Sequence, residues 1–148
     1  MRGLAFAIGT GAGLGYAPFA SGTWGSLLTL PLAALVWVGG GSIGVALAAL
    51  VVVPLCWWAA GVVEQAIGTK DPGEIVSDEI AGQWLALLAL PPGKSWLVAF
   101  LAFRLFDVWK PGPIGRLEKR GGAFGIMIDD LLAGVVALVI AHAFHRFV

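Results

Sequence analysis

The amino-acid sequence predicts an all-α integral membrane protein, a helical bundle of about four to five helices, some of them short or re-entrant. Hydrophobic residues make up 59% and charged residues only 12% of the chain, whereas soluble domains contain about 25% charged residues. The mean hydropathy is +0.91. A length of 148 residues fits one domain, so we expect residues 1–148 to form a single membrane-embedded unit.

The first pair of apolar segments predicts a helical hairpin. Residues 43–63 carry no charge over 21 positions, which is long enough to cross the core of a bilayer. Residues 27–38 are apolar but shorter, and the Gly-Gly-Gly-Ser sequence at 39–42 favours a turn between the two segments. The chain is therefore expected to return to the side of the membrane that it left.

The second half of the chain predicts three further apolar helices. Residues 80–90 and 95–106 are separated by a Pro-Pro-Gly-Lys sequence, so they form either two short antiparallel helices or a re-entrant pair. Residues 131–148 are apolar over most of their length, and we expect them to form the last helix.

The charged residues are concentrated in two segments. Fifteen of the 18 lie in 64–79 and 104–130, and these include all nine acids. If both hairpins return to the side they left, the two segments share one membrane face. That face collects six basic residues: Lys70, Arg104, Lys110, Arg116, Lys119 and Arg120. The opposite face has Lys94 and Arg146, so the positive-inside rule places the charged face in the cytoplasm.

The first polar motif on this face is Ser-Gly-Thr-Trp-Gly-Ser at 21–26. Glycine lets backbone amides approach an anion, and Thr23 and Ser26 supply hydroxyl groups. Gly22, Thr23 and Ser26 are therefore candidate contacts to a phosphate group. The alternative interpretation is that Ser26 only caps the start of the following helix.

Two acidic motifs lie directly before apolar segments of the sequence. Asp78 and Glu79 end the sequence Asp-Pro-Gly-Glu-Ile-Val-Ser-Asp-Glu, and Asp129 and Asp130 precede the last helix. Acids in a first helical turn also favour the helix dipole, but clustered carboxylates repel each other unless a cation compensates them. Together the four acids offer only oxygen ligands, which suits Mg²⁺ rather than Zn²⁺.

A basic motif lies between these acids, in the sequence Phe-Arg-Leu-Phe-Asp-Val-Trp-Lys-Pro at 103–111. Arg104, Asp107 and Lys110 are each three residues apart and share one helix face. Arg104 either pairs with Asp107 or binds a phosphate group through two hydrogen bonds, with Lys110 as a second positive charge. Both histidines lie near the far end of the last helix, so a histidine nucleophile is not expected. Carboxylates, cations and hydroxyls on a membrane face suit metal-assisted phosphoryl chemistry on a lipid headgroup.

These motifs, in this order, resemble those of the phosphatidylglycerophosphatase A family. The matching stretches are GTWGSL at 22–27, DPGEIVSDEIAG at 71–82, FRLFDVWKPGPI at 103–114 and GGAFGIMIDDLLAG at 121–134. The resemblance implies an all-helical, Mg²⁺-dependent phosphatase of the bacterial inner membrane. Its substrate would be phosphatidylglycerophosphate in the bilayer, and its products phosphatidylglycerol and phosphate.

The resemblance and the motifs together suggest a role for each polar residue. Four carboxylates are expected to hold one or two Mg²⁺ ions: Asp78, Glu79, Asp129 and Asp130. We expect Arg104 and Lys110 to bind phosphate oxygens, Asp107 to orient Arg104 or join the metal ligands, and Asp71 to act as general base. Thr23 either contacts the phosphate or is a nucleophile that forms a phosphoenzyme, and the sequence leaves both open.

Two other classes of function fit part of the pattern. One is another lipid-phosphate enzyme, such as a polyprenyl-pyrophosphate phosphatase or a phosphatidyltransferase; the Asp-x-x-Asp-Gly pattern of the transferase is absent from the sequence. The other is a small cation carrier, which would place acids at mid-depth on several helices. Here the acids gather on one face, which favours the enzyme.

Overall fold

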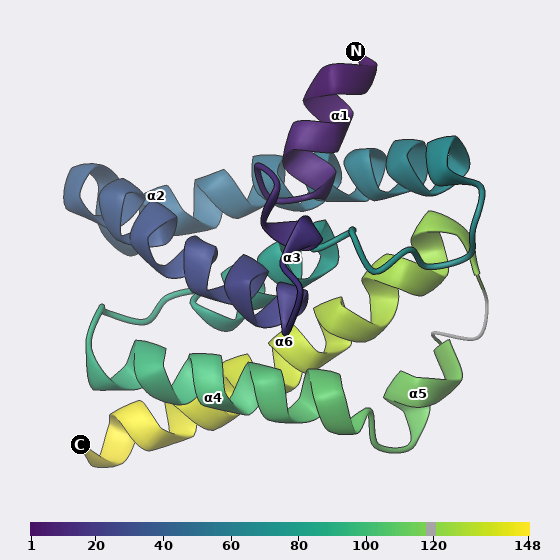
Figure 1. Cartoon of the computed structure of the whole chain (residues 1–148). Helices are drawn as coiled ribbons and strands as arrows, with labels where there is room; N and C mark the ends of the chain where they lie inside the picture. Colours follow the sequence, from purple (N-terminus) through teal and green to yellow (C-terminus); the bar gives the residue numbers. More distant parts are fainter. Residues whose placement is uncertain (118–120) are drawn as a thin grey trace.

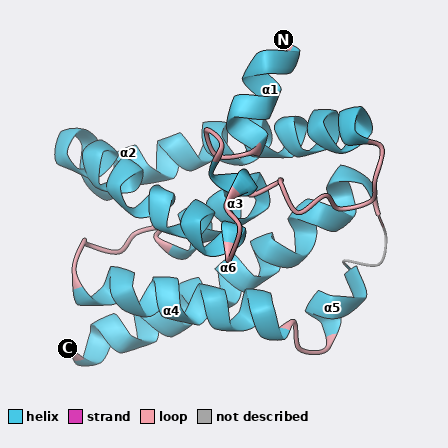
Figure 2. Cartoon of the chain, in the orientation of Figure 1, coloured by secondary structure: helices cyan, strands magenta, loops and turns pink. Residues whose placement is uncertain are grey.

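The computed structural model describes residues 1–117 and 121–148. Within these residues every regular element is a helix and there is no strand (Figures 1 and 2). The elements are α1 (Arg2–Gly9), the 3₁₀ helix η1 (Leu14–Tyr16), α2 (Ser21–Ile67), α3 (Ser77–Ala86), α4 (Lys94–Trp109), α5 (Pro113–Leu117) and α6 (Gly122–Phe147). The predicted all-α class is confirmed, and the short helices α1 and α5 add to the expected set.

Helix α2 is a hairpin of two arms. At Gly41 the backbone has φ 57° and ψ −151°, a conformation that a residue with a side chain rarely adopts. The chain therefore reverses at Gly41, and the second arm folds back from the bend (Figure 1). The hairpin predicted for 27–38 and 43–63 is confirmed, with its bend inside the expected turn. The first arm begins earlier than expected, at Ser21.

Helices α3 and α4 are short and run in opposite directions, joined by residues 87–93 (Figure 1). α3 has 10 residues and α4 has 16, so they are about 15 and 24 Å long, less than the ~30 Å core of a bilayer. Of the two alternatives that the sequence left open, a pair of short antiparallel helices or a re-entrant pair, the structure shows short antiparallel helices, and their depth in a membrane is not tested. Because α3 begins at Ser77, three residues before the expected start, Asp78 and Glu79 lie inside its first turn.

Helix α6 starts nine residues before the predicted start at 131, so that expectation was wrong. Gly121 and Gly122 both have positive φ and supply the reversal that a new helix needs. The following residues Gly125, Ile126 and Met127 are buried, so packing favours a helix from Gly122 onward. From the sequence, Asp129 and Asp130 were expected to precede the helix, but they lie two turns inside it.

The backbones of α3 and α6 touch at two glycines. A Cβ atom on Gly82 would lie 2.5 Å from the carbonyl oxygen of Asp130, and one on Gly134 would overlap the carbonyl oxygen of Gly82. Only glycine allows this approach. The contact brings the first turn of α3 beside the second turn of α6.

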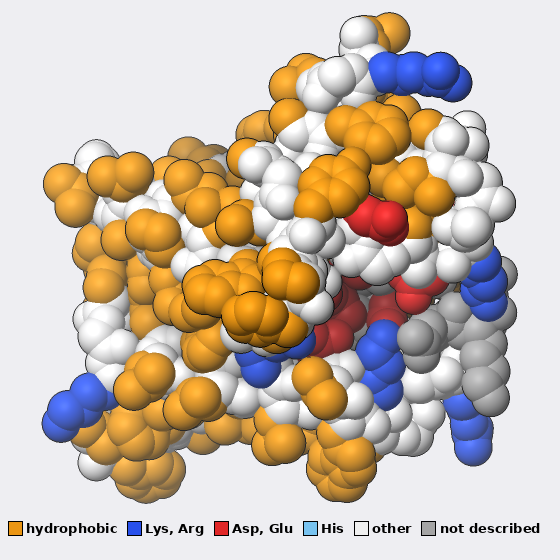
Figure 3. Space-filling view, in the orientation of Figure 1, with side chains coloured by type: hydrophobic (Ala, Val, Ile, Leu, Met, Phe, Trp, Pro, Cys, Tyr) orange, Lys and Arg blue, Asp and Glu red, His pale blue; other side chains and the backbone are white. Residues whose placement is uncertain are grey.

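Two helices, α2 and α6, are long and apolar enough to cross a membrane. Leu97, Leu101 and Leu105, one turn apart on α4, are each 57% exposed. Figure 3 shows hydrophobic side chains over much of the surface and acidic side chains gathered in a hollow. Lys119 and Arg120, counted for the expected cytoplasmic face, lie outside the described residues.

Candidate functional site

The start of α3 is fixed by contacts with α1 and α2. Val76, the residue before the helix, donates its backbone N–H to the carbonyl oxygen of Gly9 at 2.8 Å. A Cβ atom on Gly25 would lie 2.9 Å from Cβ of Val76, so the first arm of α2 also packs directly against this residue. These contacts hold the two acids of the first turn, Asp78 and Glu79, at the centre of the molecule.

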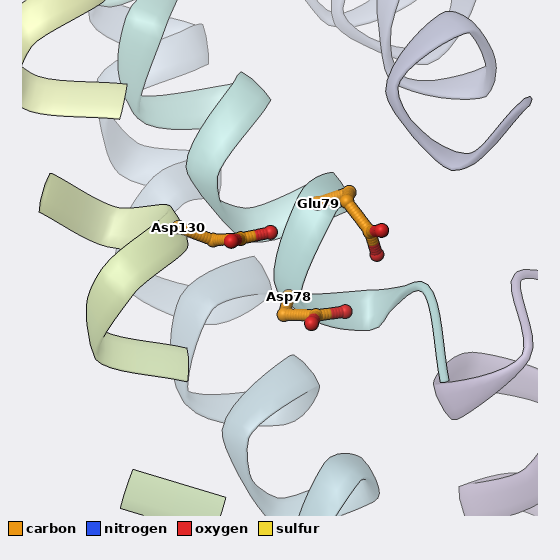
Figure 4. Close-up of side chains that lie close together, drawn as sticks. All are labelled: Asp78, Glu79 and Asp130. Carbon is orange, nitrogen blue, oxygen red and sulfur yellow. The ribbon is translucent and has the colours of Figure 1, made fainter. Parts of the chain in front are cut away.

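Three carboxylates meet where α3 approaches α6. Oxygen atoms of Asp78, Glu79 and Asp130 all lie within 4.8 Å of one another, although Asp130 is about 50 positions away in the chain (Figure 4). Asp78 is 9% exposed and Asp130 only 2% exposed. The structure thus brings together three of the four residues predicted to bind a metal.

The fourth predicted ligand, Asp129, has a different partner. Its Oδ2 atom accepts a hydrogen bond from Nζ of Lys110 at 2.6 Å, and the Asp129 side chain is 2% exposed. Successive residues of a helix point about 100° apart, so Asp129 and Asp130 present their carboxylates to different neighbours. The Asp129 carboxylate therefore holds a cationic side chain at the edge of the acidic cluster.

The second cation, Arg104, lies between two acids. Its Nη1 atom donates to Oδ2 of Asp107, an ion pair within α4. A Cβ atom on Gly22 would overlap Oε1 of Glu79 and lie 3.2 Å from Nη1 of Arg104. The Glu79 carboxylate and the Arg104 guanidinium therefore occupy the space that a side chain at position 22 would take. The intrahelical ion pair considered for Arg104 is present, and the same side chain also reaches the acidic cluster.

A polar pocket of about 170 Å³ opens onto these groups, and Figure 3 shows the acids at the bottom of a hollow. Its lining comes from four parts of the chain that are far apart in sequence: Ser21, Asp71, Pro72, Gly73, Ile75, Asp78, Glu79, Asp107, Lys110 and Asp130. The predicted meeting of the α2 start, the 64–79 segment and the 104–130 segment on one side of the molecule is confirmed.

Asp71 and Ser21 form part of the rim of this pocket. Asp71 is exposed and has a φ of 49°, the left-handed region that a residue with a side chain seldom adopts. Ser21 donates its hydroxyl to the carbonyl oxygen of Gly73 at 3.2 Å. The helix was expected to start at residue 27, which is too late. For that reason the later hydroxyls of the motif, Thr23 and Ser26, were selected and Ser21 was missed.

The two selected hydroxyl residues lie outside the described lining of the pocket. Ser26 does not cap α2, because the helix begins at Ser21 after Ala20; that interpretation was wrong. Ser26 is fully buried and its hydroxyl donates to the carbonyl oxygen of Gly22 at 2.9 Å. Thr23 is half-buried in the first turn of α2. A phosphate contact by Ser26 or Thr23 stays a prediction.

Burial and mutual repulsion disfavour the charged form of the α3 acids. Burial is the main cause that raises the pKa of Asp78 well above its usual range, and the charges of Glu79 and Asp130 add to it. Burial also raises the pKa of Glu79, although its hydrogen bond with Asp78 and the nearby Arg104 act in the opposite direction. A cation bound among these groups would favour their charged forms.

The carboxylates fit a divalent cation with oxygen ligands. Oδ1 of Asp78, Oε2 of Glu79 and Oδ2 of Asp130 are buried and have no hydrogen-bond partner among the described residues. Buried carboxylate oxygens without a partner are costly, and each of the three residues that carry them also offers an oxygen to one cluster within 4.8 Å. Mg²⁺ prefers such all-oxygen sites and keeps part of its water shell, which the adjoining pocket can accommodate.

The histidines are remote from this site, as the sequence predicted. Nδ1 of His145 lies 2.9 Å from the hydroxyl oxygen of Ser95, at the junction of the α4 start and the α6 end. His142 contacts the carbonyl oxygen of Leu138 within α6. Among the described residues that line the pocket, the groups able to act on a substrate are therefore carboxylates, Lys110 and the Ser21 hydroxyl, with Arg104 beside them.

Comparison with known proteins relates the chain to lipid phosphatases. A family model described as Phosphatidylglycerophosphatase A matches residues 7–145. Two proteins named Phosphatidylglycerophosphatase A are similar. The one from Escherichia coli is 40% identical, over 88% of this chain and 76% of its own length. The one from Haemophilus influenzae is 39% identical, over 93% and 85%.

A third relative has a different name. A Bacteroides thetaiotaomicron protein is 40% identical over 90% of this chain and 88% of its own length, and its provisional name is phosphatidylinositol-3-phosphatase. No solved structure matches the chain. The names of these three relatives all describe phosphatases that act on a phosphatidyl lipid.

Proposed function

The chain belongs to the phosphatidylglycerophosphatase A family, and we propose that it hydrolyses the terminal phosphomonoester of phosphatidylglycerophosphate to phosphatidylglycerol and phosphate. One observation carries the proposal: a single polar pocket is lined by Lys110 and by three carboxylates, each with a buried oxygen that has no hydrogen-bond partner among the described residues. The names of two relatives supply the substrate.

We propose Asp78, Glu79 and Asp130 as the residues that hold Mg²⁺. A divalent cation held there supplies positive charge that offsets the negative charge of the phosphate group in the transition state. Asp129 has a separate task in this proposal. Its ion pair fixes Nζ of Lys110 beside the pocket, so a loss of Asp129 acts through Lys110.

Arg104 and Lys110 are the groups that bind phosphate oxygens. Each is held by a nearly buried aspartate, Arg104 by Asp107 and Lys110 by Asp129. A guanidinium or ammonium group oriented in advance costs less to organise when the substrate arrives. A guanidinium has five N–H donors and an ammonium group has three, so each kind of group is able to bind more than one acceptor.

Water is the nucleophile that the pocket favours, with Asp71 as general base. Asp71 belongs to the lining of the pocket, whereas Thr23 lies outside the described lining. The water oxygen forms a bond to phosphorus while the bond from phosphorus to the glycerol oxygen breaks. Asp71 accepts the proton of the water, and the glycerol oxygen takes up a proton from solvent. Attack by Thr23, which would form a phosphoenzyme, is the alternative.

The proposed setting is the cytoplasmic face of the bacterial inner membrane. Apolar side chains of α4 face outward over its length, and the large aromatic residues Trp24 and Trp109, both near the pocket segments, are 41% and 67% exposed. Exposed tryptophans are typical of the membrane–water interface. The acyl chains then stay in the bilayer while the headgroup enters the pocket.

A substrate comparison tests this proposal. Purified protein in detergent is given phosphatidylglycerophosphate, phosphatidylinositol 3-phosphate or a polyprenyl pyrophosphate with Mg²⁺, and phosphate release is followed. We expect the highest kcat/KM for phosphatidylglycerophosphate. A higher value for the phosphoinositide, which the name of the Bacteroides relative suggests, would replace the substrate but keep the phosphatase. No release from any of the three would overturn the proposal, and cation transport in vesicles would then favour the carrier.

A further inference from the structure

Gln83 is a fully buried amide without a hydrogen-bond partner. It lies on α3 and has 0% exposure. Neither its Oε1 nor its Nε2 atom has a partner among the described residues. An amide can make up to four hydrogen bonds, and burying one with none is among the most unfavourable arrangements for an uncharged side chain.

Gln83 stands one helical turn beyond Glu79. Residues four apart on a helix are neighbours on the same face. Helical side chains lean towards the N-terminus, so a side chain covers the surface of the turn before its own. The Gln83 side chain therefore lies over the face that carries Glu79, and this face continues the acidic cluster into the interior.

Glu79 has a matching unpaired atom. Oε2 of Glu79 is buried and has no partner within 1–117 and 121–148, while its Oε1 atom lies against Gly22 and near Arg104. Both polar atoms of the Gln83 side chain have no partner among the described residues, so no direct hydrogen bond joins Gln83 to Glu79. One buried water between them would satisfy an amide N–H and a carboxylate oxygen at once, and buried waters typically serve such pairs of groups.

We propose that Gln83 is a positioning residue for the cation site: through a buried water its amide holds the Glu79 carboxylate in the orientation that Mg²⁺ requires. This inference rests on the proposed function, because it assumes that Glu79 is a metal ligand. Groups that orient metal ligands commonly change metal affinity 10- to 100-fold when they are replaced, an order-of-magnitude range.

The test is Mg²⁺ binding by the variant Gln83→Met, measured by calorimetry on the purified full chain without substrate. Methionine has a similar length and no hydrogen-bonding group of comparable strength. We expect the dissociation constant for Mg²⁺ to rise by about 10-fold or more. The unfolding temperature without metal, measured alongside, checks that any loss of affinity comes from a folded protein.

Thr29→Val is the matched control. Thr29 is also fully buried and polar, but its hydroxyl donates to the carbonyl oxygen of Gly25 within α2. We expect its Mg²⁺ affinity to equal that of the wild type. If Gln83→Met does not fold, Gln83→Leu takes its place in the same measurement.

The outcomes separate this inference from the proposed function. Wild-type protein that binds no Mg²⁺ would contradict the proposed metal site itself. Wild-type protein that binds Mg²⁺, together with a Gln83→Met variant of equal affinity, would overturn the role of Gln83 and leave the proposed function intact. An equal loss of affinity in Thr29→Val would also overturn it, since any buried polar group would then have the same effect.

Discussion

Lys110 and Asp129 form an ion pair, Nζ to Oδ2 at 2.6 Å, that joins the end of α4 to the second turn of α6. Lys110 caps α4 in the left-handed conformation, with a φ of 46°. The pair closes one side of the acidic pocket and fixes a cation there.

Lys110→Met should lower both stability and activity. The substitution removes the ion pair between Lys110 and the carboxylate of Asp129, which is 2% exposed. We expect a loss of about 2 kcal/mol in the free energy of unfolding, less than for a fully buried pair because Lys110 is 26% exposed. The double variant Lys110→Met/Asp129→Leu should regain stability in chemical denaturation but not phosphatase activity. Recovered activity in the double variant would remove Lys110 from the phosphate-binding groups.

Asp130→Asn should abolish most of the activity while the helix stays folded. The amide keeps the size of the side chain but removes one negative charge from the three converging carboxylates. We expect kcat to fall by about 10²-fold or more, and Mg²⁺ affinity to fall with it. Turnover and circular dichroism of the purified variant check this prediction. Near-normal turnover would exclude Asp130 as a metal ligand.

Gly22→Ala should reduce activity although alanine is the better helix former. A Cβ atom there overlaps Oε1 of Glu79 and crowds Arg104, so the carboxylate must move away from the cluster. Helix propensity alone would favour the alanine by about 1 kcal/mol. Gly39→Ala is the control, because nothing lies within 4 Å of a Cβ at that position of the same helix. Equal activity of the two variants would show that the space at Gly22 is not needed.

Single cysteines test the membrane orientation. Arg116 and Lys94 are exposed, and they belong to opposite faces in the proposed topology. The native Cys56 is buried and should not react with a polar thiol reagent. In intact cells, a membrane-impermeant reagent should label Lys94→Cys and leave Arg116→Cys unlabelled until the membrane is opened. The reverse pattern would place the pocket outside the cytoplasm.

The sequence predicted the parts of the fold that depend on local pattern. The bend at Gly41 follows from a run of three glycines between two apolar segments, and glycine is the residue that tolerates its positive φ. The reversal between α3 and α4 follows from two prolines and a glycine in the same way. Such signals depend on neighbouring residues alone, so a single sequence displays them.

The placement of the acids was only partly predictable. The clustering of charge in two segments indicated that Asp78, Glu79 and Asp130 would meet. Acids are costly in an apolar chain, and they are therefore found mainly at functional sites. The separate role of Asp129 depends on the start of α6 at Gly122. That start is set by burial of Gly125 to Met127 against other helices, a tertiary effect that no local pattern displays.

The hydroxyls of the first motif illustrate the same limit. A serine before an apolar run looks like a helix cap, and Ser26 fits that pattern. The helix instead begins at Ser21, where the chain meets the loop at Gly73. Ser21 is therefore the hydroxyl of this motif that lines the pocket. Its contact with the distant loop at Gly73, and not the local sequence, accounts for this.

Phosphate release from phosphatidylglycerophosphate, measured with Mg²⁺ and again with excess EDTA, tests the central claim most directly. If the Asp78, Glu79 and Asp130 carboxylates hold a catalytic cation, the purified wild-type protein releases phosphate with Mg²⁺, and chelation stops the reaction until Mg²⁺ is restored. Full release in excess EDTA, or no release in Mg²⁺, would contradict the account.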